Sequence, residues 1–158
     1  MDYFNIGLNI FCLIAQGMMH VYFCTSLTGK KQKAYYFAIY IFIFFILDWL
    51  ANMFSFPLVI GIGTELLMLY GLNRFILGNR PSASWAAAVL AGYISQFSFG
   101  LISPVEAVIS PYVTTPLLLY SMVIASTAAS LSISAVCYTI VVKSISPEEI
   151  GRMTNMGC

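Results

Sequence analysis

Five apolar segments divide this chain, each long enough to cross a bilayer, and all seven of its basic residues fall at junctions that would lie on one side of a membrane. The segments are Tyr3–Ser26, Ala34–Ser55, Leu58–Phe75, Ser84–Ile102 and Leu117–Val142. The basic residues, in chain order, are Lys30, Lys31, Lys33, Arg74, Arg80, Lys143 and Arg152. The connections Phe56–Pro57 and Ser103–Pro116 contain no Lys or Arg. Because basic loops remain in the cytosol, the pattern predicts an N-terminus outside and a cytosolic C-terminus.

The composition excludes a soluble domain. Hydrophobic residues make up 60% of the chain and charged residues 8%, with a mean hydropathy of +0.89, so too little polar surface exists to keep a folded domain in solution. We predict an all-α polytopic membrane protein whose residues 1–145 form one bundle of five transmembrane helices. Ser146-Pro-Glu-Glu149 has the residues of a helix start, so residues 146–158 are expected to be a short cytosolic tail that begins a helix.

The connections between segments predict how the helices pack. Most are so short that consecutive segments are expected to be antiparallel neighbours. Pro81, followed by Ser82 and Ser84, should start the fourth helix, with a hydroxyl capping free backbone amides. The long connection Ser103–Pro116 contains three prolines and several apolar residues, so it should lie at the outer interface, either as an inert connector or as a lid over a cavity.

Small residues predict where helix backbones approach one another. The run Ala125–Ala135 is made almost entirely of small and hydroxylated residues, which allow close helix contact in lipid. We therefore expect this part of the fifth helix to be central in the bundle or at an oligomer interface. Gly61 and Gly63 suggest a close approach, or a local distortion, at the outer end of the third helix.

Two carboxylates inside the predicted spans are the main candidates for a functional site. Asp48 and Glu65 each lie about seven residues, or ~10–12 Å, inward from the outer ends of neighbouring helices. The same depth count places Asn9, Gln96, Ser95, Ser121 and Ser126 near this level. No basic residue is expected there, and an ionisable group in hydrocarbon must be paired, neutral or hydrated. We therefore predict that at least one of the two carboxyl groups is neutral at pH 7, or that a cation or cationic ligand binds between them.

The same polar residues also have a purely structural interpretation. Asn9, Asp48, Glu65 and Gln96 could form interhelical hydrogen bonds that only fix the packing of the bundle, worth about 0.6–2 kcal/mol each. The sequence does not separate this interpretation from a ligand site. His20 is expected nearer the cytosolic side, far from the acids, as a neutral ring bonded to a backbone carbonyl or to Tyr36.

Catalysis, metal binding and cofactor binding find no support in the sequence. No Ser/His/Asp set, phosphate-binding loop, dinucleotide fingerprint or metal-ligand spacing is present, so we expect no enzyme, no metal site and no cofactor. The net charge of +1 argues against nucleic acid as a partner. Cys12, Cys24 and Cys137 lie within predicted spans and are expected to be free thiols.

Part of the sequence resembles a known family. The stretch Trp85–Gly100, the following Ser103-Pro-Val-Glu-Ala107 and the exit into Ser146-Pro-Glu-Glu149 are similar to the membrane-sensor half of bacterial sensor histidine kinases of the accessory-gene-regulator type. The resemblance implies a bacterial inner-membrane location, an extracellular signal that is often a peptide, and transmission through the last helix to a cytosolic kinase. This chain has five spans where six or seven are usual and has no nucleotide-binding motif, which implies a truncated, fragmentary or kinase-less sensor module.

Three functional hypotheses follow. The preferred one is a sensor module that binds a peptide or small-molecule ligand through Asp48, Glu65, Asn9 and Gln96 and relays binding through the fifth helix, as a homodimer or with a cytosolic kinase partner. The alternative is a small transporter, or the substrate-binding membrane subunit of one. The third is a passive membrane subunit, with membrane lipid around it, whose polar residues only hold the helices together.

Overall fold

Five long helices account for almost all of the chain that the structure describes. The computed structural model describes residues 2–54 and 57–145, so the predicted helix start at Ser146 lies outside the described residues. The helices are α1 (Asp2–Leu27), α2 (Ala34–Met53), α3 (Leu58–Gly71), α4 (Pro81–Ile109) and α5 (Pro116–Ser144). A π-helical turn, η1 (Leu72–Ile76), extends α3, and a 3-10 turn, η2 (Ser110–Tyr112), follows α4. All five helices are long and apolar enough to span a membrane, which confirms the predicted all-α fold with five candidate spans.

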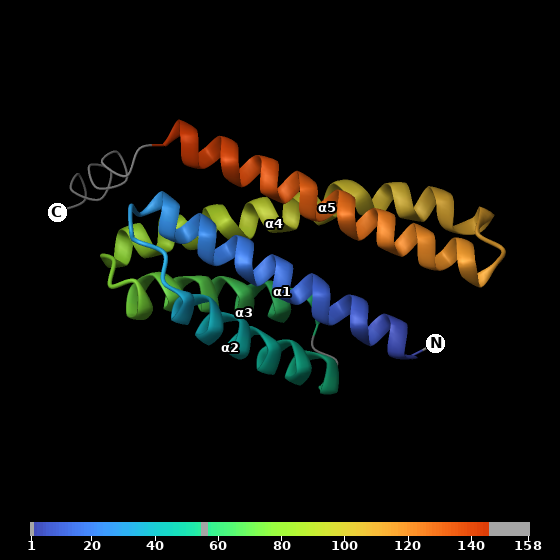
Figure 1. Cartoon of the computed structure of the whole chain (residues 1–158), viewed down its shortest axis with the longest axis horizontal. Coiled ribbons are helices and arrows are strands. Elements are labelled where there is room, and N and C mark those ends of the chain that lie inside the picture. The colour runs from blue at the N-terminus through green and yellow to red at the C-terminus, as the bar shows by residue number, and fades with distance from the viewer. Residues whose placement is uncertain (1, 55–56, 146–158) are drawn as a thin grey trace.

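The helices form one bundle in which α1 and α4 each contact three other long helices (Figure 1). Helix α4 packs against α3, α5 and α1, and α1 also packs against α2 and α5. The expectation that all consecutive helices pack together is wrong for one pair, because α2 and α3 are joined in sequence yet make few contacts. Short connections fix only where two helix ends meet. They do not force the rest of the helices to pack.

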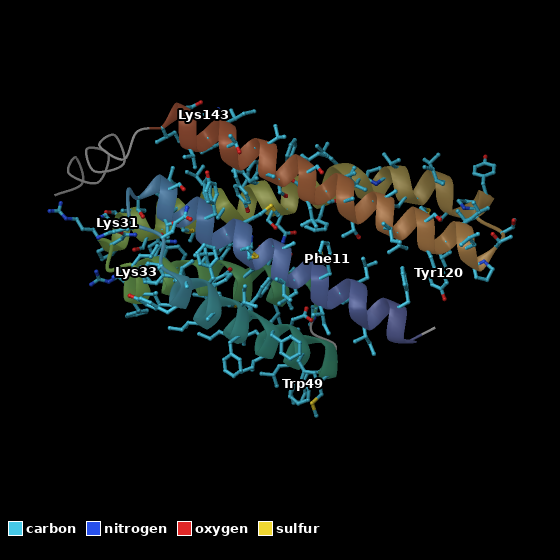
Figure 2. The ribbon with its side chains drawn as sticks, in the orientation of Figure 1. Phe11, Lys31, Lys33, Trp49, Tyr120 and Lys143 are labelled. Atoms are coloured by element: carbon cyan, nitrogen blue, oxygen red, sulfur yellow. The ribbon has the colours of Figure 1, made fainter. Side chains whose placement is uncertain are left out.

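The two ends of the bundle differ in charge. Lys31, Lys33 and Lys143 extend from the same end (Figure 2), which also carries the α1–α2 turn and the connection between η1 and α4. We call this the basic end, and the end bearing the α2–α3 and α4–α5 connections the opposite end. Helix α1 finishes at the basic end in a Schellman motif: Gly29, at φ 65°, lets the amide of Lys30 donate to the carbonyl of Thr25 at 2.9 Å.

The predicted long connection before α5 is wrong over half of its length. Helix α4 continues through Pro104 to Ile109, although proline cannot donate a backbone hydrogen bond. One missing hydrogen bond does not end a helix whose other backbone groups remain paired. Membrane helices tolerate proline because neighbouring groups can satisfy the carbonyl that it frees. Helix α4 therefore has 29 residues, about 43 Å at 1.5 Å per residue, and the α4–α5 hairpin extends past the α2–α3 connection (Figure 1).

The helix starts also differ from the expectation. Arg80 precedes α4 with no side-chain cap, and the Ser84 hydroxyl donates to the Arg80 carbonyl at 2.9 Å rather than accepting from a free amide. The predicted hydroxyl cap of α4 is therefore wrong. A hydroxyl cap is found instead at α5, where the amide of Leu118 donates to Thr115 Oγ1 at 3.3 Å.

The tightly packed core lies toward the basic end. Its fully buried side chains include Val21, Phe23, Leu27, Leu69 and Tyr40. Helix α4 contributes a face of small residues, which allows neighbouring helices to approach closely. The buried residues of this face include Ser84, Ala87, Ala88, Ala91, Gly92, Ser95 and Ser98. From α5, the residues buried in the bundle are Ser130, Ser134 and Tyr138.

Candidate functional site

Glu65 lies at the centre of a polar cluster that joins several helices. Its side chain projects from α3 and the residue is only 8% exposed. Gln96 Nε2 on α4 donates to Glu65 Oε2 at 2.8 Å, and Gln16 Nε2 on α1 donates to Oε1 at 3.3 Å. The same Gln16 amide donates to Ser95 Oγ at 2.8 Å. Two amides therefore donate to the two oxygens of the carboxyl group, an arrangement suited to a group with acceptor oxygens only.

His20 belongs to this cluster, contrary to the expectation that it lies far from the acids. Its Nε2 lies 3.5 Å from Glu65 Oε1, and its Nδ1 lies 2.9 Å from the Tyr40 hydroxyl. The predicted partner, Tyr36, is wrong by one helical turn. Depth counted from the end of each helix misplaced His20 because α1 begins beyond the α2–α3 connection (Figure 1), so the helices do not share a common starting height.

The hydrogen-bond pattern favours one tautomer of His20. When the Tyr40 hydroxyl donates to Nδ1, the ring proton is on Nε2 and faces the Glu65 carboxyl group. Within the part of the chain that the structure describes, the fully buried Nε2 has no hydrogen-bond partner of good geometry. A small movement of the Glu65 side chain would therefore complete a bond that is nearly formed.

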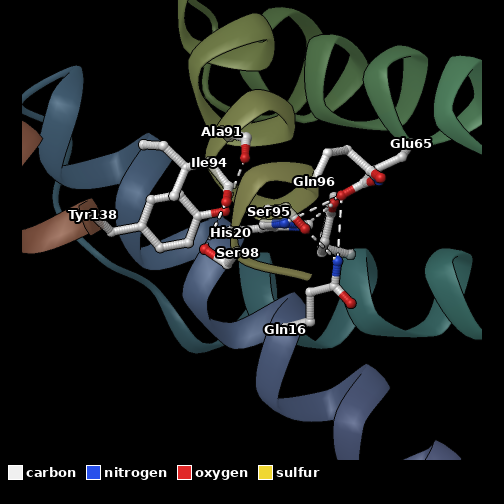
Figure 3. A network of polar contacts seen from close by, with 10 residues as sticks. Gln16, His20, Glu65, Ala91, Ile94, Ser95, Gln96, Ser98 and Tyr138 are labelled. Carbon is white, nitrogen blue, oxygen red and sulfur yellow. Dashed lines mark hydrogen bonds and ion pairs between the residues drawn. The ribbon is translucent and has the colours of Figure 1, made fainter. Parts of the chain in front are cut away.

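The cluster reaches all five helices. Glu65 is on α3, Gln16 and His20 are on α1, and Gln96 is on α4. Through His20 the cluster also reaches α2 and α5: Tyr40 bonds to the ring, and the ring of Tyr138 lies 6.3 Å from it, edge to face. The Tyr138 hydroxyl donates to the carbonyl of Ala91 at 2.9 Å. Figure 3 shows Tyr138 on one side of His20 and Glu65 on the other.

A cavity opens beside Glu65 between α2 and α3. Its volume is about 220 Å³, and its lining includes Asp48, Glu65, Thr64, Phe44 and Phe54. We call it the acid cavity. Gly61 lines it as well, and a Cβ added at Gly61 or Gly63 would meet nothing within 4 Å. The predicted close helix approach at these glycines is therefore wrong, and at Gly61 the missing side chain leaves space.

A second cavity lies on the other side of Asp48, between α1 and α2. Its volume is about 270 Å³, and it is lined by Asn9, Cys12, Leu13, Gln16, Phe44 and Asp48. We call it the amide cavity. Asp48 itself is exposed and lines both cavities. The polar side chains of α1 thus approach Asp48 from one side, and Glu65 approaches it from the other.

The structure brings together all four residues predicted as ligand-binding. Gln96 is bonded to Glu65, Glu65 shares the acid cavity with Asp48, and Asp48 shares the amide cavity with Asn9. Ser95 is also in the cluster, through Gln16. Ser121 and Ser126 are not in these cavities; they line a different one between α4 and α5. The layer is therefore built from α1 to α4, and α5 enters it through Tyr138.

Sequence reasoning missed Gln16, His20 and Tyr40. A signal for the first two was present, because Asn9, Gln16 and His20 are spaced seven and four residues apart and so fall on one helical face. Tyr40, Phe44 and Asp48 repeat every four residues on α2 in the same way. Matching these two stripes would have placed His20 beside Tyr40.

The site has the chemistry of a receptor for positive charge. Its charged side chains are carboxylic, and none of the Lys or Arg residues in the described ranges lines the acid cavity or the amide cavity. Phe44 and Phe54 supply ring faces that also attract cations. Among residues 2–54 and 57–145 no group of three or more metal-ligating side chains is found.

The comparisons with known proteins identify no relative of this chain, so the interpretation depends on the geometry of the site. The sequence matches no protein-family model, and it matches no curated protein and no solved structure.

Proposed function

We propose that this chain is a membrane sensor module that binds a cationic ligand, or a ligand with a cationic group, between Asp48 and Glu65. The observation that carries the proposal is the position of Glu65, which lines the acid cavity and also bonds to amides on α1 and α4. A ligand that attracts the carboxyl group must compete with Gln16, Gln96 and His20 for it. Binding would therefore change the contacts between helices.

The path to α5 runs through His20. If a ligand draws Glu65 into the cavity, the distance between Glu65 Oε1 and His20 Nε2 increases. The His20 ring contacts Tyr40 and Tyr138. Tyr138 is close to the basic end of α5, which finishes at Ser144. A ligand that prefers one arrangement of these groups would shift the population of α5 positions toward it. The expected output is a movement of α5 at the basic end.

The orientation in the membrane is part of the proposal. Six of the seven basic residues lie in the described ranges, at the α1–α2 turn, between α3 and α4, and at the end of α5. The positive-inside rule then places the basic end in the cytosol and the N-terminus outside. The acid cavity would open in the outer half of the bilayer, and the signal would leave through the chain that follows α5. The resemblance to sensor histidine kinases supports the same direction and a bacterial inner membrane.

The proposal is tested by measuring the position of α5. Spin labels at residues 31 and 143, both at the basic end, report its distance from the α1–α2 turn in protein reconstituted in nanodiscs. Methylammonium is the probe, because it is small enough for the acid cavity and carries one charge. We expect it to produce a second distance population in the wild type, and Asp48→Asn and Glu65→Gln to remove this response. Glu106→Gln, which removes a carboxylate outside the cavity, is the matched control and should retain it.

Failure of the sensor hypothesis would have a clear form. If methylammonium binds with the same affinity to the wild type and to Glu65→Gln, or leaves the label distances unchanged in both, the acid cavity is not a signalling site. The polar cluster would then serve only to hold the helices together, as in the passive-subunit hypothesis.

A second function, transport, is favoured by one observation. A further cavity of about 340 Å³ follows the acid cavity along the gap between α2 and α3, toward the basic end, and both are lined by Met68. A substrate released from Glu65 could pass along this gap. Uptake of radiolabelled methylammonium into proteoliposomes that depends on Glu65 would support a transporter, whereas binding without uptake supports the sensor.

A further inference from the structure

An open cavity that the proposed sensor site does not use lies between the two helices of the α4–α5 hairpin. Its volume is about 550 Å³, and it is lined by facing stripes of the two helices, with Val105, Glu106 and Ile109 on α4 and Ser121, Ala125 and Ser126 on α5. We call it the hairpin cavity. The α5 wall has Leu118 and Met122, but its other lining residues, Ser121, Ala125, Ser126 and Ala129, are small and leave space opposite the larger residues of α4. Val105 and Ile109, predicted to lie in a connector or a lid, are walls of this cavity.

Glu106 is the one carboxyl group that lines the hairpin cavity among the described residues, and Tyr112 adds a phenol. The Glu106 side chain is half-buried, and within residues 2–54 and 57–145 no side chain or amide forms a hydrogen bond or ion pair with its carboxyl group. The described Lys and Arg residues are all at the basic end, and Glu106 lies about 37 Å from the start of α4 at 1.5 Å per residue. No basic side chain of the described chain can reach it.

We propose that the hairpin cavity binds a hydrophobic ammonium ion, with the charged group on Glu106 and the apolar body between α4 and α5. The walls are almost entirely apolar, so they select an aliphatic or aromatic body. The carboxyl group has no partner within the described chain, so it selects a cation over an alcohol or an anion. The Ser121 and Ser126 hydroxyls donate to carbonyls of their own helix, and their oxygens remain available to accept from an ammonium group.

The position of Glu106 fits an amphiphile of this kind. A bilayer has a hydrocarbon core of about 30 Å, so a carboxyl group about 37 Å along α4 is near the headgroup region at the opposite end of the bundle. The ammonium group would stay near water, while the body extends along the hairpin toward Ala129. This site is separate from the acid cavity, and its existence does not depend on the proposed sensor function.

The test uses octylammonium as the probe, with 1-octanol and octanoate as neutral and anionic partners of the same length. The full chain is kept in dodecyl maltoside, which contains no ammonium group, and affinity is obtained from the rise of the thermal unfolding midpoint with probe concentration. We expect octylammonium to bind more tightly than either partner. Glu106→Gln should weaken octylammonium binding by about tenfold, the loss of one charged hydrogen bond, and leave octanol binding unchanged.

Two further variants test whether the measured binding occurs in the hairpin cavity. Glu65→Gln removes a carboxyl group of the acid cavity and should leave unchanged the part of octylammonium binding that depends on Glu106, so failure here is distinct from failure of the sensor proposal. Ala125→Leu places a larger side chain in the empty space and should weaken both octylammonium and octanol without preventing folding. Equal octylammonium affinity in the wild type and Glu106→Gln would overturn the proposal. So would a Glu106-dependent stabilisation by phosphatidylethanolamine alone, which would identify the occupant as a lipid headgroup.

Discussion

His20 Nε2 lies 3.5 Å from Glu65 Oε1, inside a bundle whose described Lys and Arg residues are all at one end. His20 is therefore the basic side chain that faces the buried acid, and the two residues are 45 positions apart in the sequence but adjacent in the fold. In the tautomer that accepts the Tyr40 hydroxyl at Nδ1, the proton on Nε2 faces the Glu65 carboxyl group. Any change in the charge or position of Glu65 reaches α2 and α5 through one imidazole ring.

Replacing Glu65 by leucine should destabilise the bundle. The change keeps the approximate size of the side chain but leaves the half-buried amide of Gln96 without its acceptor and leaves that of Gln16 with Ser95 alone. An unsatisfied buried donor costs about 1–3 kcal/mol, so we expect the free energy of unfolding to fall by that amount in an SDS titration of the reconstituted protein. Glu65→Gln, which retains an acceptor oxygen, should lose less.

The control for this change is Glu106→Leu. The carboxyl group of Glu106 accepts no hydrogen bond from the described residues, so removing it leaves no donor unsatisfied and should not lower stability. Equal losses in Glu65→Leu and Glu106→Leu would mean that the Glu65 cluster does not hold the helices together.

Tyr40→Phe should weaken the contact between α1 and α2. The hydroxyl is the hydrogen-bond partner of His20 Nδ1, and both residues are almost fully buried. Hydrogen bonds between membrane helices average about 0.6 kcal/mol and reach about 1.7 kcal/mol, and we expect a loss in this range by SDS unfolding. Tyr93→Phe removes a hydroxyl from a residue that is 68% exposed and should change stability little. A ¹⁵N NMR spectrum that places the ring proton of His20 on Nδ1 would contradict the proposed tautomer.

The spans could be predicted because their signal is local. A helix must satisfy its own backbone in lipid, so an apolar stretch of sufficient length implies one, and the predicted starts at Ala34 and Leu58 agree with α2 and α3. The partners of Glu65 could be predicted only where the depth count was sound. It placed Gln96 correctly although the count began at Ile102, because the rest of α4 extends past the α2–α3 connection (Figure 1).

What the sequence could not provide depends on how the helices are placed relative to one another. The height of His20 depends on how far α1 extends past α2 and α3, and the acid cavity depends on the separation of α2 from α3. Neither quantity is encoded in local hydropathy. The continuation of α4 through Pro104 was missed for another reason: proline disfavours a helix locally, but one lost backbone bond is small beside those that the remaining residues keep.

Gly92→Val should separate α3 from α4. A Cβ added at Gly92 would lie 2.7 Å from Leu66 Cδ2 and 3.8 Å from Leu69 Cδ1, so the further methyl groups of valine have no room. Forcing extra atoms into packed space costs about 1–3 kcal/mol, and the α3–α4 contact that positions Glu65 beside Gln96 should loosen. Gly100→Val is matched in chemistry and in helix, yet its Cβ meets nothing within 4 Å. SDS unfolding should show a clear loss for the first variant and little for the second; similar losses would reflect helix propensity alone.

Thiol labelling should distinguish a cysteine in the amide cavity from one in the core by its reactivity. Cys12 lines the amide cavity beside Asn9 and Asp48, whereas Cys24 is fully buried and accepts from Asn73 Nδ2 at 3.2 Å. With Cys137 and Cys158 replaced by serine, a small charged methanethiosulfonate should therefore modify Cys12 in the native protein and leave Cys24 unmodified until the bundle unfolds. Because this cavity is polar and contains a carboxyl group, the cationic reagent should react faster than the anionic one of the same size, and Asp48→Asn should reduce that difference.

Labelling of intact cells by the membrane-impermeant reagent tests the orientation in the membrane. Reaction at Cys12 from outside agrees with an outer opening of the amide cavity, and reaction only after the cells are opened would reverse the proposed topology.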